Sequence, residues 1–110
     1  TLYVVSNASL AQQSARIGKA GLDRYFAKIF ASEDIGADKP SKAFFDTVFT
    51  ELSDVKPCET LLVGDSPTAD IAGGNTYGIK TCWLNRGTYP GQNVECDYEI
   101  HSLKDLIGLF

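Results

Sequence analysis

Ten consecutive residues decide the fold of this chain: Leu61-Leu62-Val63-Gly64-Asp65-Ser66-Pro67-Thr68-Ala69-Asp70. An apolar run typical of a buried strand passes directly into a Gly-Asp turn, and a second aspartate follows one helical turn later. Ser66 suits the N-cap of a helix and Pro67 its first position, which places Asp70 near the positive end of that helix. A carboxylate at the carboxyl end of a buried strand lies where open α/β sheets bind ligands. Asp65 is therefore a candidate ligand for Mg²⁺, although the same two aspartates would also serve a plain helix start.

The composition is that of one small globular domain. Hydrophobic residues make up 44% and charged residues 22% of the 110 residues, which argues against disorder. The net charge of -4 argues against a surface for nucleic acid polymers. No apolar run approaches the ~20 residues of a membrane span, so no membrane partner is expected. The three cysteines show no C-x-x-C spacing and predict reduced thiols in a cytoplasmic protein.

Predicted strands and helices alternate along the chain. Apolar runs predict strands at 2–5, 28–32, 60–63 and 81–84, with a short edge strand at 98–100. Helices are predicted from the capping box at Ser9 to residue 20, as a short turn at 22–26, along an apolar stripe at 44–52, at 67–77 and from 102 onward, with Leu103, Leu106, Ile107 and Phe110 facing inward. Residues 33–40 are predicted to form a polar loop. This order predicts an α/β fold with a Rossmann-like, mostly parallel sheet and flanking helices.

Further polar residues follow the predicted strands. Ser6-Asn7 ends the first strand, Lys39-Pro40 follows the second, and Asn85-Arg86 ends the fourth. Because parallel strands end at one edge of a sheet, these residues could converge with Gly64-Asp65. Lys39 precedes a helix start, where an added cation would create an anion site, although a solvated loop lysine is the ordinary alternative. His101, the only histidine, lies far from this set, so no histidine-based triad is expected. Cys82 and Trp83 are expected to belong to the core.

The ordered combination resembles a known family. A strand with Ser6-Asn7, then Lys39-Pro40, then a strand with Gly64-Asp65-x4-Asp70 is similar to motifs II, III and IV of the haloacid dehalogenase-like (HAD) hydrolase superfamily. The resemblance covers nearly the whole chain. It looks closest to the bacterial pyrimidine 5′-nucleotidase-like phosphatases through residues 32–36, 70–74 and 81–85.

The resemblance implies a role for each matching residue. Ser6 and Asn7 would bind the phosphoryl group, Lys39 would neutralise its charge, and Asp65 would bind Mg²⁺. Asp70 would support the metal site from behind or bind the metal directly. Ser6, Lys39 and Asp65 would thus be catalytic in a Mg²⁺-dependent phosphomonoesterase. Such an enzyme would act on a small phosphomonoester, plausibly a nucleoside 5′-monophosphate, through an aspartyl-phosphate.

The chain also departs from the family pattern. Motif I, a strand followed by Asp-x-Asp that supplies the nucleophile, has no match, and the substrate-selecting cap between motifs I and II is absent. The chain opens on Thr1 inside a strand-like run. We therefore expect residues 1–110 to be the C-terminal part of one HAD-like core domain, inactive alone. Two alternatives stay open: a 2-haloacid dehalogenase-like hydrolase, against which Gly64-Asp65 argues, and an inactive or binding piece.

The missing strand has a consequence for the sheet. In the family it lies between the strands that correspond to residues 2–5 and 61–63. Its loss would leave two apolar strand edges with unpaired backbone groups. The gap could be filled by the missing segment as a separate chain, which we favour, by a second copy, or by direct pairing of the two strands.

Overall fold

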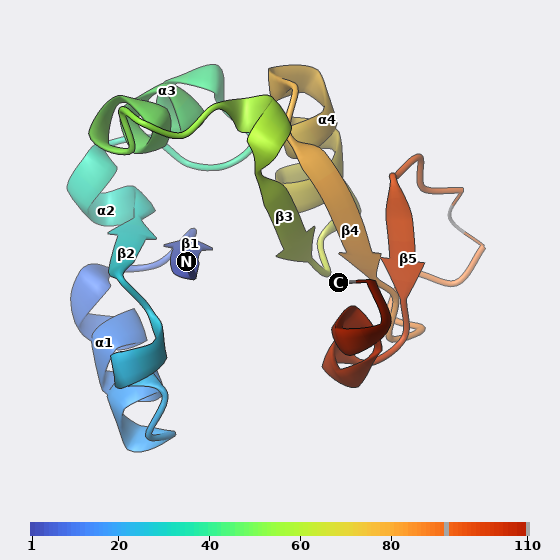
Figure 1. Cartoon of the computed structure of the whole chain (residues 1–110), viewed down its shortest axis with the longest axis horizontal. Coiled ribbons are helices and arrows are strands. Elements are labelled where there is room, and N and C mark those ends of the chain that lie inside the picture. Colours follow the sequence, from blue (N-terminus) through green and yellow to red (C-terminus); the bar gives the residue numbers. More distant parts are fainter. Residues whose placement is uncertain (92, 110) are drawn as a thin grey trace. The chain divides into compact units, whose positions relative to one another are not determined.

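The computed structural model describes residues 1–91 and 93–109 and has an α/β architecture of parallel strands with flanking helices (Figure 1). The chain divides into two compact units, Thr1–Glu51 and Leu52–Phe110, and each is described by itself. The predicted alternation of strands and helices is confirmed. None of the helices in these described ranges is long and apolar enough to cross a membrane.

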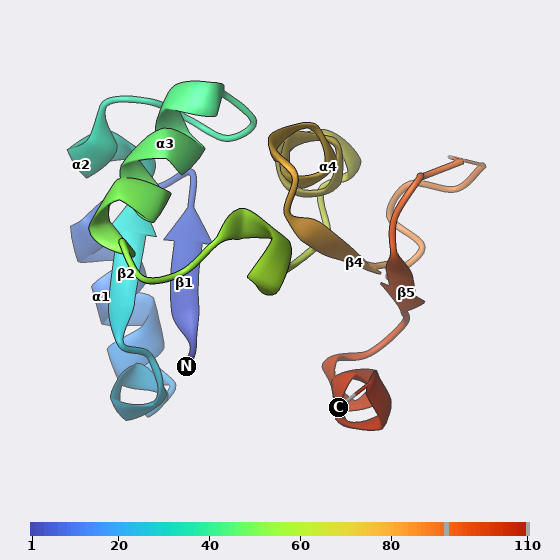
Figure 2. The same cartoon turned by 45° about the horizontal axis from the view of Figure 1, so that its top comes forward.

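The first unit is built on two parallel strands. Its elements in order are β1 (Tyr3–Ser6), α1 (Leu10–Lys19), η1 (Asp23–Tyr25), β2 (Lys28–Ala31), α2 (Ser32–Ile35) and α3 (Lys42–Glu51). Strands β1 and β2 pair in register from Tyr3 opposite Lys28 to Ser6 opposite Ala31. Helices α1 and α3 lie on opposite faces of this pair (Figure 2). The apolar stripe of α3 supplies much of the buried core, with Phe44, Phe45 and Val48.

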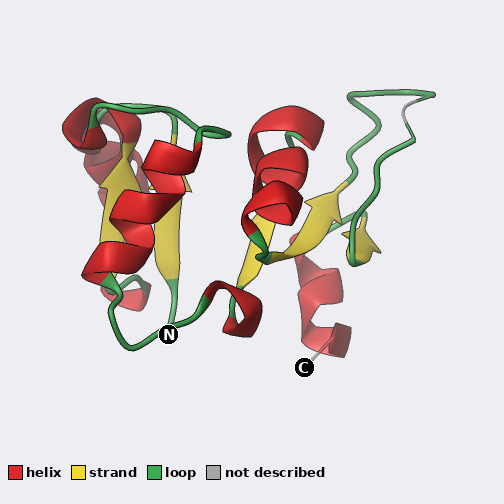
Figure 3. Cartoon of the chain, turned by 90° about the horizontal axis from the view of Figure 1, so that it is seen from above, coloured by secondary structure: helices red, strands yellow, loops and turns green. Residues whose placement is uncertain are grey.

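The second unit is built on three parallel strands with β4 in the centre (Figure 3). Its elements are η2 (Pro57–Glu59), β3 (Leu61–Gly64), the π-helix η3 (Pro67–Ala72), α4 (Gly73–Tyr77), β4 (Lys80–Leu84), β5 (Tyr98–Ile100) and the 3₁₀ helix η4 (Leu103–Leu109). Gly64 lies opposite Trp83, and Cys82 opposite Tyr98. Cys82 and Trp83 are buried, as predicted. β3 is an edge strand of this sheet, as β1 is of the other.

Helix α1 begins as its sequence predicts. The Ser9 hydroxyl accepts the Gln12 N–H at 3.0 Å, and the Ser9 N–H donates back to the Gln12 side chain at 3.5 Å. Both bonds satisfy donors that have no partner inside a helix. The helix is followed by Gly21 at φ 72°, a left-handed conformation that favours glycine.

Two local predictions are wrong. Residues 33–40 are not one loop, because Ser32–Ile35 form α2, with Glu33 and Asp34 favourably placed in its first turn and Gly36 ending it at φ 81°. The helix predicted for 67–77 is confirmed, and it starts as the π-helix η3 and ends as the α-helix α4.

The second error concerns the inward face of the last helix. Leu106 packs against the core, but Leu103 is 54% and Ile107 is 79% exposed. This segment forms a 3₁₀ helix, whose three-residue turn does not keep the predicted α-helical stripe on one side. Phe110 lies outside the described residues.

Candidate active site

The first predicted cluster lies at the carboxyl end of β1, where Asn7 holds the backbone of Lys39. The Lys39 N–H donates to Asn7 Oδ1 at 2.8 Å, and Asn7 Nδ2 donates to the Lys39 carbonyl at 3.0 Å. The side-chain amide thus pairs with both polar groups of one residue, as a neighbouring strand would. Residues 32 positions apart are brought together in this way. The prediction that these residues meet is confirmed within this unit.

The Lys39 side chain also points to the end of β1. Its ammonium donates to the Val5 carbonyl at 3.2 Å, and the side chain is half-buried. Ser6 follows Val5 directly, so a hydroxyl and a cation share one strand end. Both groups donate hydrogen bonds and suit an anionic oxygen.

Ser6 has a partner that the sequence analysis did not identify. Gln13 Nε2, on the second turn of α1, donates to Ser6 Oγ at 2.8 Å. Gln13 is half-buried, whereas its neighbour Gln12 is exposed and used in the helix cap. The sequence shows two adjacent glutamines, and only the Ser9 cap distinguishes them. The capping box uses Gln12, which leaves the Gln13 side chain for another contact.

The second predicted cluster lies at the carboxyl end of β3. Asp65 follows the strand directly, and its side chain is exposed. Its backbone carbonyl accepts the indole N–H of Trp83 at 3.2 Å. Trp83 is only 3% exposed and lies opposite Gly64 in the sheet, so a rigid buried side chain fixes the main chain at Asp65. The sequence predicts Trp83 in the core but does not reveal this contact.

Asp70 lies behind the turn that carries Asp65. It is 6% exposed, and its carboxylate accepts the Ser66 N–H at 3.3 Å. A Cβ atom at Gly64 would collide with the Asp70 side chain, so the carboxylate fills space that only glycine leaves open. Ser66 in turn caps η3 by accepting the Ala69 N–H at 3.0 Å. Asp70 thus stabilises this turn by packing against Gly64 and by accepting the Ser66 N–H.

The donor chemistry of this end of β3 fits a hard cation. Asp65 offers exposed carboxylate oxygens, and Mg²⁺ sites commonly use one or two carboxylates and keep several waters. Among the residues that the structure describes, no three His, Cys, Asp or Glu side chains form a ready-made metal cluster. The described residues therefore offer such a cation only a few protein ligands.

The end of β4 carries the remaining predicted pair, Asn85-Arg86. Asn85 Oδ1 accepts the Gly87 N–H at 3.0 Å, and Asn85 Nδ2 donates to Glu99 at 3.3 Å. Arg86 is exposed. The Asn85 side chain therefore shapes the start of the following loop, at the same edge of the three-stranded sheet as Asp65.

Cys82 and Cys96 are shielded thiols, whereas Cys58 is exposed. Burial, with a smaller contribution from Cys96, raises the pKa of Cys82 above its ordinary value of 9.0. Burial also raises the pKa of Cys96, assisted by Glu99. Neutral thiols are weak nucleophiles, so neither residue is a candidate for covalent chemistry.

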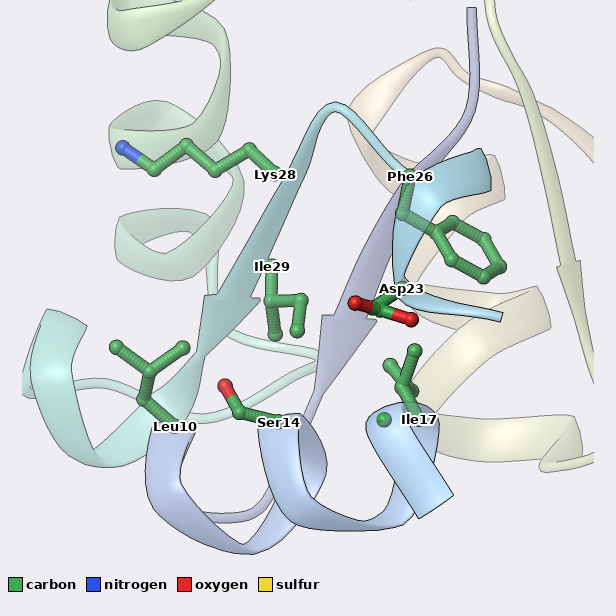
Figure 4. A pocket seen from close by; sticks show the side chains of 8 residues that line it. Leu10, Ser14, Ile17, Asp23, Phe26, Lys28 and Ile29 are labelled. Atoms are coloured by element: carbon green, nitrogen blue, oxygen red, sulfur yellow. The ribbon is translucent and has the colours of Figure 1, made fainter. Parts of the chain in front are cut away.

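A pocket of about 430 Å³ lies elsewhere on the first unit, between α1 and β2 (Figure 4). Its apolar lining includes Ile17, Phe26 and Ile29, and Asp23 adds a negative charge. It contains none of the predicted site residues. Pocket size therefore does not identify the chemistry of this chain.

Comparison with known proteins supports the resemblance. A family model described as HAD-hydrolase-like matches residues 36–106, more than half of the chain. HAD-hydrolase YfnB of Bacillus subtilis is 41% identical over 106 residues, covering 96% of this chain and 45% of that protein. Pyrimidine 5′-nucleotidase PynA of Streptococcus pneumoniae is 36% identical over 107 residues, covering 96% and 45%.

Solved structures agree with the sequence matches. The crystal structure of YfnB bound to magnesium superposes with a TM-score of 0.88 at 40% identity, covering 98% of this chain and 47% of that one. The chain spans about half the length of these relatives.

Proposed function

The chain belongs to the HAD-like hydrolases, and from this membership we propose that it supplies part of the active site of a Mg²⁺-dependent phosphomonoesterase. Ser6, Asn7 and Lys39 of the first unit would bind the phosphoryl group, and Asp65 and Asp70 of the second unit would serve the metal ion. Its substrate would be a small phosphate ester, plausibly a nucleoside 5′-monophosphate, because two pyrimidine 5′-nucleotidases are among the relatives.

The observation that carries this proposal is the pairing of Asn7 with the backbone of Lys39. It holds the Lys39 backbone at the end of the strand that carries Ser6, and Lys39 Nζ lies 3.2 Å from the carbonyl of Val5, the residue before Ser6. A fixed cation and a hydroxyl donor stabilise the charge on phosphoryl oxygens, and such stabilisation is most of phosphoryl-transfer catalysis. In this role Ser6 and Lys39 bind and neutralise the phosphoryl group, and the Asn7 backbone N–H adds a further donor.

Asp65 would hold the metal ion, and Asp70 would keep the turn of Asp65 in place. A bound Mg²⁺ supplies neutralisation of the phosphate charge. The support within this chain is the exposed carboxylate of Asp65, held at its carbonyl by Trp83 and braced by the buried Asp70. Because it offers few protein ligands, the isolated chain should bind Mg²⁺ with a dissociation constant well above the micromolar range. Isothermal titration calorimetry would measure this constant.

The nucleophile would come from outside these 110 residues. No Asp-x-Asp occurs in the sequence, and β1 and β3 each have one edge that pairs with no other described strand of their own sheets. We propose that a strand bearing Asp-x-Asp completes the fold and attacks phosphorus to form an aspartyl-phosphate. The substrate-selecting cap would likewise lie outside this chain.

The test compares the isolated chain with a longer polypeptide that joins it to an Asp-x-Asp strand. The isolated chain should not hydrolyse p-nitrophenyl phosphate with Mg²⁺, whereas the longer polypeptide should. In the latter, Lys39→Ala and Asp65→Ala should each lower kcat by at least about 100-fold. Lys42→Ala and Asp54→Ala, which remove exposed charges nearby in sequence, are the matched controls. Near-normal turnover of either site variant would contradict its assigned role.

A 2-haloacid dehalogenase activity is the second candidate. One solved 2-haloacid dehalogenase, from Pseudomonas syringae, is 32% identical with a TM-score of 0.79. Dehalogenation needs no metal ligand, so Asp65 argues for the phosphatase. Halide release from a 2-haloacid by the longer polypeptide, unaffected by Asp65→Ala and by removal of Mg²⁺, would reverse this preference.

A further inference from the structure

Gln13 makes one specific contact, with a residue that the proposed function uses. Its Nε2 lies 2.8 Å from Ser6 Oγ, and both side chains are half-buried at the carboxyl end of β1. The contact joins α1 to the strand that it follows. The neighbouring Gln12 has the same side chain but is exposed and serves the helix cap. The two glutamines therefore have the same chemistry but differ in their burial and in the residues that they contact.

The direction of this hydrogen bond decides what Ser6 can do. A hydroxyl has one proton to donate and two lone pairs that accept. The Gln13 amide donates, so it occupies a lone pair of Ser6 and does not use the hydroxyl proton. A phosphoryl oxygen only accepts hydrogen bonds. A hydroxyl that already accepts from an amide is also polarised toward donating its own proton.

We propose that Gln13 is a positioning residue that sets Ser6 as a hydrogen-bond donor to the phosphoryl oxygen of the substrate. The inference rests on the proposed function and adds to it a residue outside the matched motifs. Gln13 does not touch the reacting atoms and acts through Ser6 alone. Reversing the direction of the Gln13–Ser6 bond should therefore matter more than removing it.

The two substitutions that separate these effects are Gln13→Glu and Gln13→Met. The first keeps the shape of the side chain but replaces the donor with an ionised acceptor. The Ser6 hydroxyl would then donate its hydrogen bond to this carboxylate and no longer to the substrate. We expect it to lower kcat/KM for p-nitrophenyl phosphate by about 100-fold, the effect of losing one oriented donor. The second removes the bond without reversing it and should cost only about 10-fold, as the loss of a supporting contact does. Gln12→Glu, the same charge change one residue away, should stay within about twofold, because glutamate also suits a capping box.

Two further readouts distinguish positioning from a structural role. In a Ser6→Ala background, Gln13→Glu should have no additional effect, whereas charge repulsion or misfolding would persist without the hydroxyl. The deficit of Gln13→Glu should also shrink as the pH falls through about 4–5, where a carboxyl gains a proton to donate. Both measurements use the longer polypeptide that carries Asp-x-Asp.

The outcomes separate this inference from the proposed function. If the wild-type longer polypeptide does not hydrolyse phosphate esters, both fail. If it does, but Gln13→Glu matches Gln12→Glu or keeps its penalty in the Ser6→Ala background, only the role of Gln13 is wrong. A harmless Gln13→Glu beside a damaging Gln13→Met would show that Ser6 donates to Gln13, which also overturns the inference.

Discussion

Replacing Gly64 by alanine tests the contact between the Gly-Asp turn and Asp70. Gly64 lies in β3 with an extended backbone, so alanine brings no conformational strain there. The cost must come from the added Cβ, which would overlap the side chain of Asp70. Asp70 is 6% exposed, and moving it would break its bond with the Ser66 N–H.

The expected loss of stability follows from these terms. Overpacking a buried site costs about 1–3 kcal/mol, and a hydrogen bond to a charged group contributes about 1.5–3 kcal/mol. Replacing glycine by alanine also reduces the entropy of the unfolded chain, which raises the free energy of unfolding by about 0.4–1 kcal/mol. We therefore expect Gly64→Ala to lower the free energy of unfolding by about 1.5–5.5 kcal/mol. Urea unfolding followed by circular dichroism and by the fluorescence of Trp83, the only tryptophan, would measure it.

Two comparisons make this prediction specific. Gly18→Ala is the matched control, since a Cβ at this position in α1 meets nothing within 4 Å and should stabilise the chain by about 0.5–1 kcal/mol. In an Asp70→Gly background, the penalty of Gly64→Ala should fall by at least about 1 kcal/mol, because residues in contact are energetically coupled. Equal penalties with and without the Asp70 side chain would refute the proposed collision.

Further predictions concern the cap and the thiols of the isolated chain. Ser9→Ala should lower the free energy of unfolding by about 1 kcal/mol in urea titrations, since it removes the side-chain cap of α1. Alkylation by iodoacetamide, followed by mass spectrometry, should proceed in the order Cys58, Cys96, Cys82, because Cys58 is exposed, Cys96 is partly buried and Cys82 is fully buried. Because burial raises the pKa of Cys82 above 9.0, its contribution to stability is intact below pH 9 and is lost as the pH rises beyond that value. Denaturation midpoints between pH 8 and pH 11 should therefore fall less steeply in Cys82→Ala than in wild type.

The parts of the fold that could be predicted depend on local sequence signals. Apolar runs predicted β3 and β4 because β4 buries most of its side chains and those of β3 are buried or partly buried, and the Ser9 cap predicted the start of α1 because its bonds are local. Helix α2 was missed because its polar residues are as common in loops as in short helices. The exposed Leu103 and Ile107 show the opposite error, since an apolar stripe was taken to mean burial.

The contacts that organise the candidate site could not be predicted in the same way. Asn7 and Lys39 were expected to meet, but the sequence did not show that the amide would pair with the lysine backbone. Trp83 was expected in the core, yet its indole N–H also holds the Asp65 carbonyl. Each of these contacts joins residues from different elements, so it depends on the tertiary arrangement and leaves no periodic signal.

The motif around β3 therefore has a physical explanation that its individual residues do not reveal. Gly64 is required because Asp70 fills the space beside it, and Asp70 is held there because it accepts the Ser66 N–H. With the Asp65 carbonyl tied to Trp83, the turn is fixed on both sides while the Asp65 carboxylate stays exposed. The glycine and the second aspartate act as one structural pair. A substitution of Gly64 or of Asp70 should therefore disturb the position of the Asp65 carboxylate that lies between them in the sequence.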